Sequence, residues 1–308
     1  MTLIYQPVPL HQMTKDEAWK QGRSRRWPKW STVCHLHALG LPVVNTCMVP
    51  PGRSGMLAEA ITMMAAACKT DRLMLRSDGG IETKKYYRGG KVFPVATLER
   101  EASPLLADGR SILLLEPTDR LDNRLNALFR MDRDTFNGDG EISIELLGPG
   151  YDIADLTRGS IPPQMTVTIS NVSWRHYSRP WWSDISVKIH EFSESERRDR
   201  RLDFIRQHIL IPTGKLDESS DRSDVVAWLK SHGYERLWQP IDRDRIKAMI
   251  SRWHEDLFMV AQTYPNRAWN CLATGWSLMG IGRTIYWDVV DSAHKYGVTN
   301  GLRGSYEL

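Results

Sequence analysis

The stretch LMLRSDGGIETKKYYRGG, residues Leu73 to Gly90, is the most informative part of the sequence. An apolar run that is typical of a β-strand leads into four glycines, two arginines and two lysines around Glu82. Glycines let backbone N–H groups come close to an anion, and the guanidinium of Arg76 can bind two phosphate oxygens at once. The stretch is therefore either a phosphate-binding loop or a solvated surface turn, because glycine-rich turns beside charged residues are common.

Helices and strands are expected on both sides of this stretch. The pattern predicts a helix opened by Ser31 or Thr32 and closed by Gly40, and a second helix, rich in Ala and Met, over residues 55–70. Apolar runs predict strands at residues 41–51, 72–77, 90–96, 111–117, 125–132, 140–148 and 165–170. An Asn-Gly-Asp-Gly run at 137–140 is typical of a hairpin turn.

From about Ser193 the sequence becomes charged and helical in its pattern. Helices are expected at residues 193–210, 221–233, 243–264 and 282–297. We therefore predict an α+β protein in two parts, with mixed and antiparallel sheets in residues 1–192 and a mainly helical region in residues 193–308. The 12 Trp residues are expected mainly in helix–helix cores, since large aromatics dominate core burial.

Composition excludes several classes of protein. The chain has 308 residues, 41% of them hydrophobic and 25% charged, which argues against disorder throughout. No apolar run is long enough to span a membrane and the first residues lack the apolar core of a signal peptide, so we expect a soluble, cytoplasmic protein without a membrane partner. Four cysteines without a close pair fit a reducing compartment. A net charge of +4 is too small to argue for nucleic acid as a partner.

A second candidate site lies in DGEISIELLGPG, residues 139–150. Strand alternation places Glu145 on the face opposite to Ile144. Gly148 and Gly150 follow in a loop that can keep the backbone close to a bound cofactor. A strand carboxylate near a phosphate-binding loop is a suitable ligand for Mg²⁺. The alternative is an edge-strand glutamate in water.

A third candidate is Glu116, which ends the apolar run SILLLEP beside Pro117. Proline at that point prevents simple continuation of the strand pairing and leaves backbone groups exposed. An adenine ring can use such groups as hydrogen-bond partners in a mostly apolar pocket. A strand end without a ligand is the alternative.

Taken in order, these segments resemble the N-terminal nucleotide-binding domain of the pyruvate phosphate dikinase and phosphoenolpyruvate synthase family, a member of the wider ATP-grasp class. The resemblance runs from Lys29 to about Pro163. It is carried by Lys29 followed by GLPVV, by LRSDGGIET, by LLLEPTD, by NALFRMDRDTFNGDGEISIE and by IELLGPGYDIADLTRGSIPPQ. The chain departs from the family where RWPKW replaces the Gly-Gly before the lysine and where Ala127 replaces a glycine.

The resemblance implies an ATP-grasp-like N-terminal lobe that holds MgATP in a cleft. Lys29 and Arg76 would hold the phosphates, Glu82 would lie near the triphosphate or orient Arg76, Glu116 would lie beside the adenine, and Glu145 would bind Mg²⁺. The rest of the chain is too short for the family's pyruvate-binding barrel, which takes roughly 250 residues. The complete dikinase reaction is therefore not expected.

Bound MgATP leaves three functions open. Phosphoryl transfer to a small-molecule acceptor, with Arg76 and Lys29 as the catalytic cations, is the expected activity, because this reaction needs mainly positioning and charge neutralisation. A carboxylate acceptor would instead form an acyl phosphate for capture by an amine, the chemistry of ATP-grasp ligases. The third alternative is a non-catalytic nucleotide sensor or scaffold whose helical part docks a partner protein. A zinc site is not expected, because His35 and His37 do not share a helix face.

Overall fold

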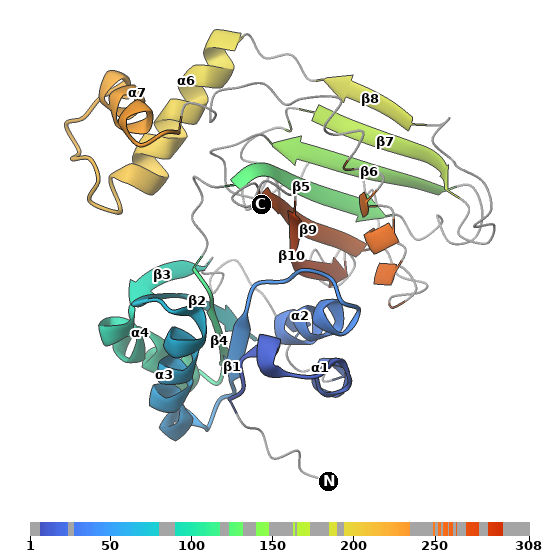
Figure 1. Cartoon of the computed structure of the whole chain (residues 1–308), viewed down its shortest axis with the longest axis vertical. Coiled ribbons are helices and arrows are strands. Elements are labelled where there is room, and N and C mark those ends of the chain that lie inside the picture. The colour runs from blue at the N-terminus through green and yellow to red at the C-terminus, as the bar shows by residue number, and fades with distance from the viewer. Residues whose placement is uncertain are drawn as a thin grey trace. The chain divides into compact units, whose positions relative to one another are not determined.

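The computed structural model of the chain (Figure 1) describes much of the N-terminal third and separate stretches of the rest. The described residues are 7–23, 28–79, 90–117, 123–131, 140–147, 163, 165–172, 185–189, 194–234, 249, 252–253, 255–257, 259–260, 263, 269–276 and 283–291. Contacts divide the chain into two units, Met1–Thr118 with Tyr286–Val290, and Asp119–Ile285 with Asp291–Leu308. The chain therefore returns to its first unit near its end.

The first unit contains a four-stranded antiparallel sheet in the order β1-β4-β2-β3. Along the chain, strands and helices follow as β1 (Thr46–Val49), α3 (Leu57–Cys68), β2 (Arg72–Asp78), β3 (Lys91–Pro94), α4 (Val95–Ala107) and β4 (Ser111–Leu115). The helical segments outside this series are η1 (Leu10–Gln12), α1 (Lys15–Gly22), α2 (Pro28–Ala38) and η2 (Ser54–Met56). The glycine-rich stretch, used from here on for residues 79–90, thus connects β2 to β3, two neighbouring strands.

One face of this sheet packs against α3 and α4 (Figure 1). Strand side chains alternate between faces, so every second residue of a strand contributes to this core. The strand members are Cys47, Val49, Leu73, Leu75, Ile112 and Leu114, and the helix members are Leu57, Ala60, Ile61, Met64, Leu98, Ala102 and Leu106. Burial of one Leu or Ile side chain stabilises a fold by about 1.5–3 kcal/mol. This core therefore holds both helices on the sheet.

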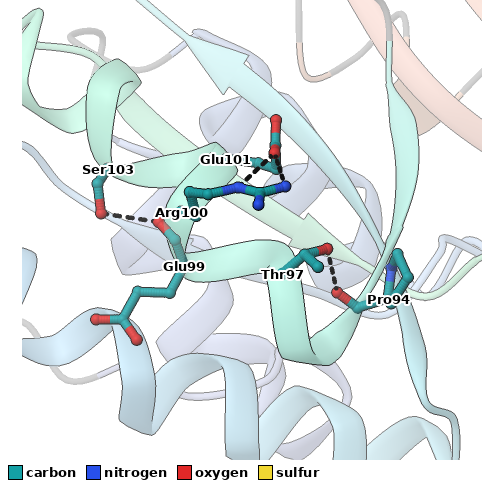
Figure 2. A network of polar contacts seen from close by, with 6 residues as sticks. All are labelled: Pro94, Thr97, Glu99, Arg100, Glu101 and Ser103. Atoms are coloured by element: carbon teal, nitrogen blue, oxygen red, sulfur yellow. Dashed lines mark hydrogen bonds and ion pairs between the residues drawn. The ribbon is translucent and has the colours of Figure 1, made fainter.

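Helix α4 was not among the helices expected from the sequence, and it contains a proline, Pro104. Figure 2 shows the side-chain hydrogen bonds near it: the Thr97 hydroxyl donates to the Pro94 carbonyl at 3.1 Å, and the Ser103 hydroxyl donates to the Glu99 carbonyl at 2.8 Å. Pro104 has no N–H for the carbonyl four residues before it. The helix forms nevertheless because Leu98, Ala102 and Leu106 belong to the core. Tertiary packing therefore outweighs a local signal against helix.

The second unit contains most of a six-stranded sheet in the order β10-β9-β5-β6-β7-β8, in which residues 286–290 of β10 are grouped with the first unit. Its strands are β5 (Asn123–Met131), β6 (Gly140–Leu147), β7 (Met165–Val172), β8 (Ile185–Ile189), β9 (Trp269–Trp276) and β10 (Arg283–Asp291). Strands β5 to β8 pair in sequence as antiparallel neighbours, and β9 pairs antiparallel with β5. The helices with given bounds are α6 (Glu194–Ile205), continued by a π-helical turn at Arg206–Leu210, and α7 (Arg222–Ser231).

The two faces of this second sheet differ in polarity. The register places one set of buried apolar residues on one face: Ala127, Phe129, Ile144, Leu146, Met165 and Val167. Trp253, from a helical run near residues 252–260, meets the Phe129 ring edge to face at 5.0 Å on this side. The opposite face is mixed: it carries the polar residues Asn126, Arg130, Ser143, Glu145, Thr166 and Thr168, and also the buried residues Leu128 and Leu147. The described residues of one face are therefore apolar, and those of the other combine buried leucines with hydrogen-bonding and charged groups.

Most of the predicted elements are confirmed, and three expectations are wrong. Helix α2 begins at Pro28 rather than at Ser31 or Thr32, since proline is suited to the first helical position. Residues 283–291 form strand β10, where a helix over 282–297 was expected. Strand β9 was not expected, so the region after residue 192 is less helical than predicted. Strand β9 lies between β5 and β10 in the sheet, and β5 is a partner from a distant part of the sequence.

The α+β class is confirmed. The predicted boundary between residues 192 and 193 coincides with the start of α6 at Glu194, inside the second unit. As a division into two lobes it stays a prediction. Among the described helices, none combines the length and the apolar character needed to cross a membrane.

Candidate functional site

The C-terminal end of β2 is fastened to the N-terminal end of α2. The Lys29 ammonium donates a hydrogen bond to the Ser77 carbonyl at 2.9 Å, and the Trp30 backbone N–H donates to a carboxylate oxygen of Asp78 at 2.9 Å. Both bonds join residues 48 positions apart in the sequence. Lys29 is 7% exposed and Trp30 is fully buried. The structure therefore brings Lys29 to the strand that carries Arg76, and the predicted role of both residues in holding phosphates stays a prediction.

Asp78 is the acidic partner at this strand end, and sequence reasoning assigned it no role. Its side chain is fully buried and accepts from the first turn of α2, where a helix dipole favours negative charge. Its backbone carbonyl accepts a hydrogen bond from the Ser111 hydroxyl at 3.0 Å. The signal in the sequence was an aspartate directly after a strand, but nothing local identified α2 as its partner. Asp78 thus joins β2 to both α2 and β4.

Arg76 is half-buried, and its side chain lies next to Gly90, the last residue of the glycine-rich stretch. A Cβ atom added to Gly90 would lie 3.1 Å from Cγ of Arg76 and 2.6 Å from the sulfur of Met74. At the other end, a Cβ atom on Gly79 would lie 3.7 Å from Cγ of Arg110. The two ends of the stretch therefore each lie next to the stem of an arginine. Arg110 is a cation that sequence reasoning missed.

Residues 80–89, and with them Glu82, lie outside the described residues. The same holds for Gly148 and Gly150. Their predicted roles beside the nucleotide stay predictions.

Glu116 follows directly after β4 and is half-buried. Its backbone N–H donates to the Asn45 carbonyl at 2.9 Å, which extends the β1–β4 pairing by one residue. Burial of the thiol, and next the charge of Glu116, raise the pKa of Cys68 to about 11. The Glu116 carboxylate is therefore close enough to Cys68 to act on it electrostatically. Lys29, Arg76 and Glu116 all belong to the first unit.

Glu145 belongs to the second unit and is paired with Arg130. The guanidinium of Arg130 donates through Nε to Oε1 at 3.0 Å and through Nη2 to Oε2 at 2.9 Å. Both side chains are mostly buried, at 18% and 22% exposure. The pair is diagonal across two strands, since Glu145 is opposite Leu128 in the register. Both carboxylate oxygens therefore already have a cationic partner, and the role of Glu145 as an Mg²⁺ ligand stays a prediction.

Cys34 and His35, two other reactive side chains of the first unit, give no support to nucleophilic catalysis. Burial raises the pKa of the Cys34 thiol well above its usual range, and burial lowers the pKa of His35. At neutral pH a thiol and an uncharged imidazole are therefore expected, not a thiolate nucleophile. Within the part of the chain that the structure describes, no three His, Cys, Asp or Glu residues gather as metal ligands would.

Comparisons with known proteins give no family for the chain. No family model matches it, and no curated protein matches it. Among solved structures it is similar to D-cycloserine synthetase DcsG, with 13% identity and a TM-score of 0.36 over 83% of this chain and 59% of that one. It is also similar to macrocyclase MdnC bound with precursor peptide MdnA from Microcystis aeruginosa MRC, with 8% identity and a TM-score of 0.33 over 90% of this chain and 54% of that one.

The chain thus spans a little over half the length of both proteins. These TM-scores are too low to establish a shared fold.

Proposed function

We propose that the protein is an ATP- and Mg²⁺-dependent enzyme that transfers the γ-phosphoryl group to a small-molecule acceptor. The observation that carries the proposal is the hydrogen bond from Lys29 to the Ser77 carbonyl, which brings a second cation to the end of β2, the strand that also carries Arg76. The glycine-rich stretch begins at the same strand end. Cations and close backbone at one place are what binding of a triphosphate requires.

The two cations have different parts in this proposal. Arg76 is half-buried, and its planar guanidinium can bind two phosphate oxygens. Lys29 is nearly fully buried and fastens α2 to β2, so it contributes charge and holds the strand end in place. Phosphoryl transfer depends mainly on positioning and on neutralising charge on the transferred group. A bound Mg²⁺ would supply further neutralisation, with Glu145 as its proposed ligand.

The acceptor decides between two forms of this activity. An alcohol acceptor would be released as a phosphate ester. A carboxylate acceptor would become an acyl phosphate, which an amine then attacks with release of inorganic phosphate, so that the enzyme is an ATP-grasp-type ligase. Both forms need the same MgATP site. Docking of a partner protein by the helical segments after residue 192 is a separate proposal and is not needed for either form.

Calorimetric titration with a non-hydrolysable ATP analogue, with and without Mg²⁺, tests the nucleotide site. Replacement of Arg76 by Ala should weaken binding about tenfold or more, because hydrogen bonds to charged groups contribute about 1.5–3 kcal/mol. Arg72→Ala is the matched control, since Arg72 is an exposed arginine at the other end of β2. Unfolding curves of both variants show whether the fold is retained.

Either result is informative about the proposal. Mg²⁺-dependent binding that is lost in Arg76→Ala and kept in Arg72→Ala supports it. A wild-type protein that binds no nucleotide, or an Arg76→Ala variant that binds as wild type does, would overturn it. With binding established, phosphorus NMR of acceptor mixtures distinguishes the two forms: a phosphate ester accumulates in one, and inorganic phosphate appears only with an amine in the other.

A further inference from the structure

Two stacked histidines attach the first helical segments of the chain to the rest of the first unit. The His11 ring of η1 lies 5.7 Å from the His37 ring of α2, with 25° between the ring planes. The His11 imidazole donates a hydrogen bond to the Val43 carbonyl at 3.1 Å, and the His11 backbone N–H donates to the Asn45 side-chain oxygen at 3.2 Å. The His37 imidazole donates to the Met13 carbonyl at 3.4 Å. The two rings therefore join η1 both to α2 and to the chain before β1.

The segment that they attach, η1 and α1 with residues 10–22, is called the N-terminal strap below. Its buried residues are Leu10, Ala18 and Gly22. A segment with few buried apolar contacts opens at a lower free-energy cost than the core does. The attachment of the strap therefore depends strongly on the contacts of the two histidines.

The charges that act on His37 are positive. Burial lowers the pKa of His37 below its ordinary value of 6.5, the hydrogen bond to Met13 opposes this shift, and the charges of His11 and Lys15 lower the pKa further. Lys15, in the first turn of α1, reaches the C-terminal end of α2, where its Nζ atom would lie 3.1 Å from a Cβ atom added to Gly40. Positive charge on His37 would therefore be repelled from two sides.

The acidic residues of α1 do not balance these charges. Asp16 and Glu17 are exposed, and neither is among the groups that shift the pKa of His37. The Glu17 carboxylate instead accepts from the backbone N–H and from the hydroxyl of Thr14, both at 2.8 Å. The Val43 carbonyl and the Asn45 amide, which bond to His11, carry no charge. Protonation of the imidazoles leaves their donated bonds possible and adds mainly repulsion.

We propose that the N-terminal strap is released by acid: positive charge on both His11 and His37 detaches η1 from the side chain of Asn45. While the strap is attached, the neutral His37 imidazole is favoured, and the detached strap binds a proton more readily. The attachment is therefore strongest above pH 6.5 and weakens as the pH falls toward the lower, native pKa of His37. This inference does not depend on the proposed function.

The test compares the hydrogen exchange of two amides that bond to the same residue. The His11 N–H bonds to the side chain of Asn45, and the Glu116 N–H bonds to its backbone carbonyl at 2.9 Å. Exchange is measured at about pH 7.5 and about pH 5.5 and corrected for the intrinsic rates. Protection of the His11 amide should fall by up to about tenfold, the limit for one histidine that stays neutral only in the attached state. Protection of the Glu116 amide should not fall.

His37→Gln should remove most of this fall, because glutamine can still donate to the Met13 carbonyl and cannot take up a proton. His232→Gln is the matched control, since His232 is an exposed histidine of the second unit and its replacement should leave the fall unchanged. If His37→Gln does not fold, Lys15→Gln removes one of the two facing charges and leaves both rings in place. It should make the fall smaller.

Three outcomes would overturn the inference. Protection of the His11 amide could be equal at the two pH values, so that acid does not release the strap. It could fall together with that of the Glu116 amide, which indicates a loss of stability in the whole unit. It could also fall in His37→Gln, or in Lys15→Gln, as much as in the wild type, so that His37 is not the group that responds. A fall confined to His11 and removed by His37→Gln supports the inference.

Discussion

Glu145 has an observed contact and a proposed role. Its mostly buried carboxylate forms a bidentate ion pair with Arg130, and the same carboxylate is the proposed Mg²⁺ ligand. Removal of one member of a buried pair is costly because the other charge is left without compensation. Substitution of either residue should therefore lower stability, whereas only substitution of Glu145 should change the dependence on Mg²⁺.

Glu145→Gln and Arg130→Gln should each lower the free energy of unfolding by about 1–3 kcal/mol, because each removes the bidentate ion pair between two mostly buried side chains. Only Glu145→Gln should also raise the Mg²⁺ concentration that nucleotide binding requires. Urea unfolding gives the first quantity and calorimetry at several Mg²⁺ concentrations gives the second. An Mg²⁺ requirement that is the same in Glu145→Gln and in the wild type would remove Glu145 from the metal site.

At the scale of elements, His35 of α2 packs against α1. The ring of His35 lies 4.8 Å from that of Trp19, and a Cβ atom on Gly22 would lie 2.3 Å from its Cδ2 atom. Burial, and next the charge of Arg23, lower the pKa of His35 below its ordinary value of 6.5. The native state therefore favours the neutral imidazole, and the unfolded chain binds a proton more readily.

Because the unfolded state binds more protons below pH 6.5, the contribution of His35 to stability is present above that pH and is lost as the pH falls toward the lower, native pKa. Urea unfolding at about pH 7.5 and about pH 5.5 should show this loss in the wild type. His35→Gln cannot titrate and should lose less stability over the same interval. Equal losses in both proteins would show that His35 does not contribute to the pH dependence.

Local pattern was enough to predict most elements, and it failed where a distant partner decides. Helix α3 and strands β1, β2, β4, β5, β6 and β7 follow from apolar periodicity and from flanking Gly and Pro residues. Helix α4 contains Pro104, and its core contacts are what stabilise it as a helix. Strand β10 was expected as a helix, and its neighbour in the sheet, β9, was not expected either, so the sequence reasoning supplied no strand for it to pair with.

At the scale of the whole molecule, residues 286–290, late in the sequence, complete the first unit. Tyr286 is fully buried and donates its backbone N–H to the Pro42 carbonyl at 2.9 Å. A parallel bridge pairs it with Val43. Residues 286–290 therefore contribute to a unit whose other residues all precede 119.

Tyr286→Ala should lower the free energy of unfolding by about 3 kcal/mol or more, since truncation of a buried aromatic leaves a cavity. Trp19→Ala is the control, because Trp19 is 36% exposed and loses mainly its ring contact, worth about 1 kcal/mol. Thermal or urea unfolding measures both. A Tyr286→Ala variant as stable as Trp19→Ala would contradict the assignment of residues 286–290 to the core of the first unit.

The sequence by itself determined the α+β class, the strand before the glycine-rich stretch and the pairing of β5 with β6, because periodicity and turn residues act over a few positions. Only the tertiary structure decided that Lys29 lies at the end of β2, that Asp78 bonds to the first turn of α2, that Asn45 bonds to Glu116, and that Glu145 is paired with Arg130. The physical reason is that each of these bonds joins residues that the fold brings together from distant positions, and no local pattern specifies such a partner.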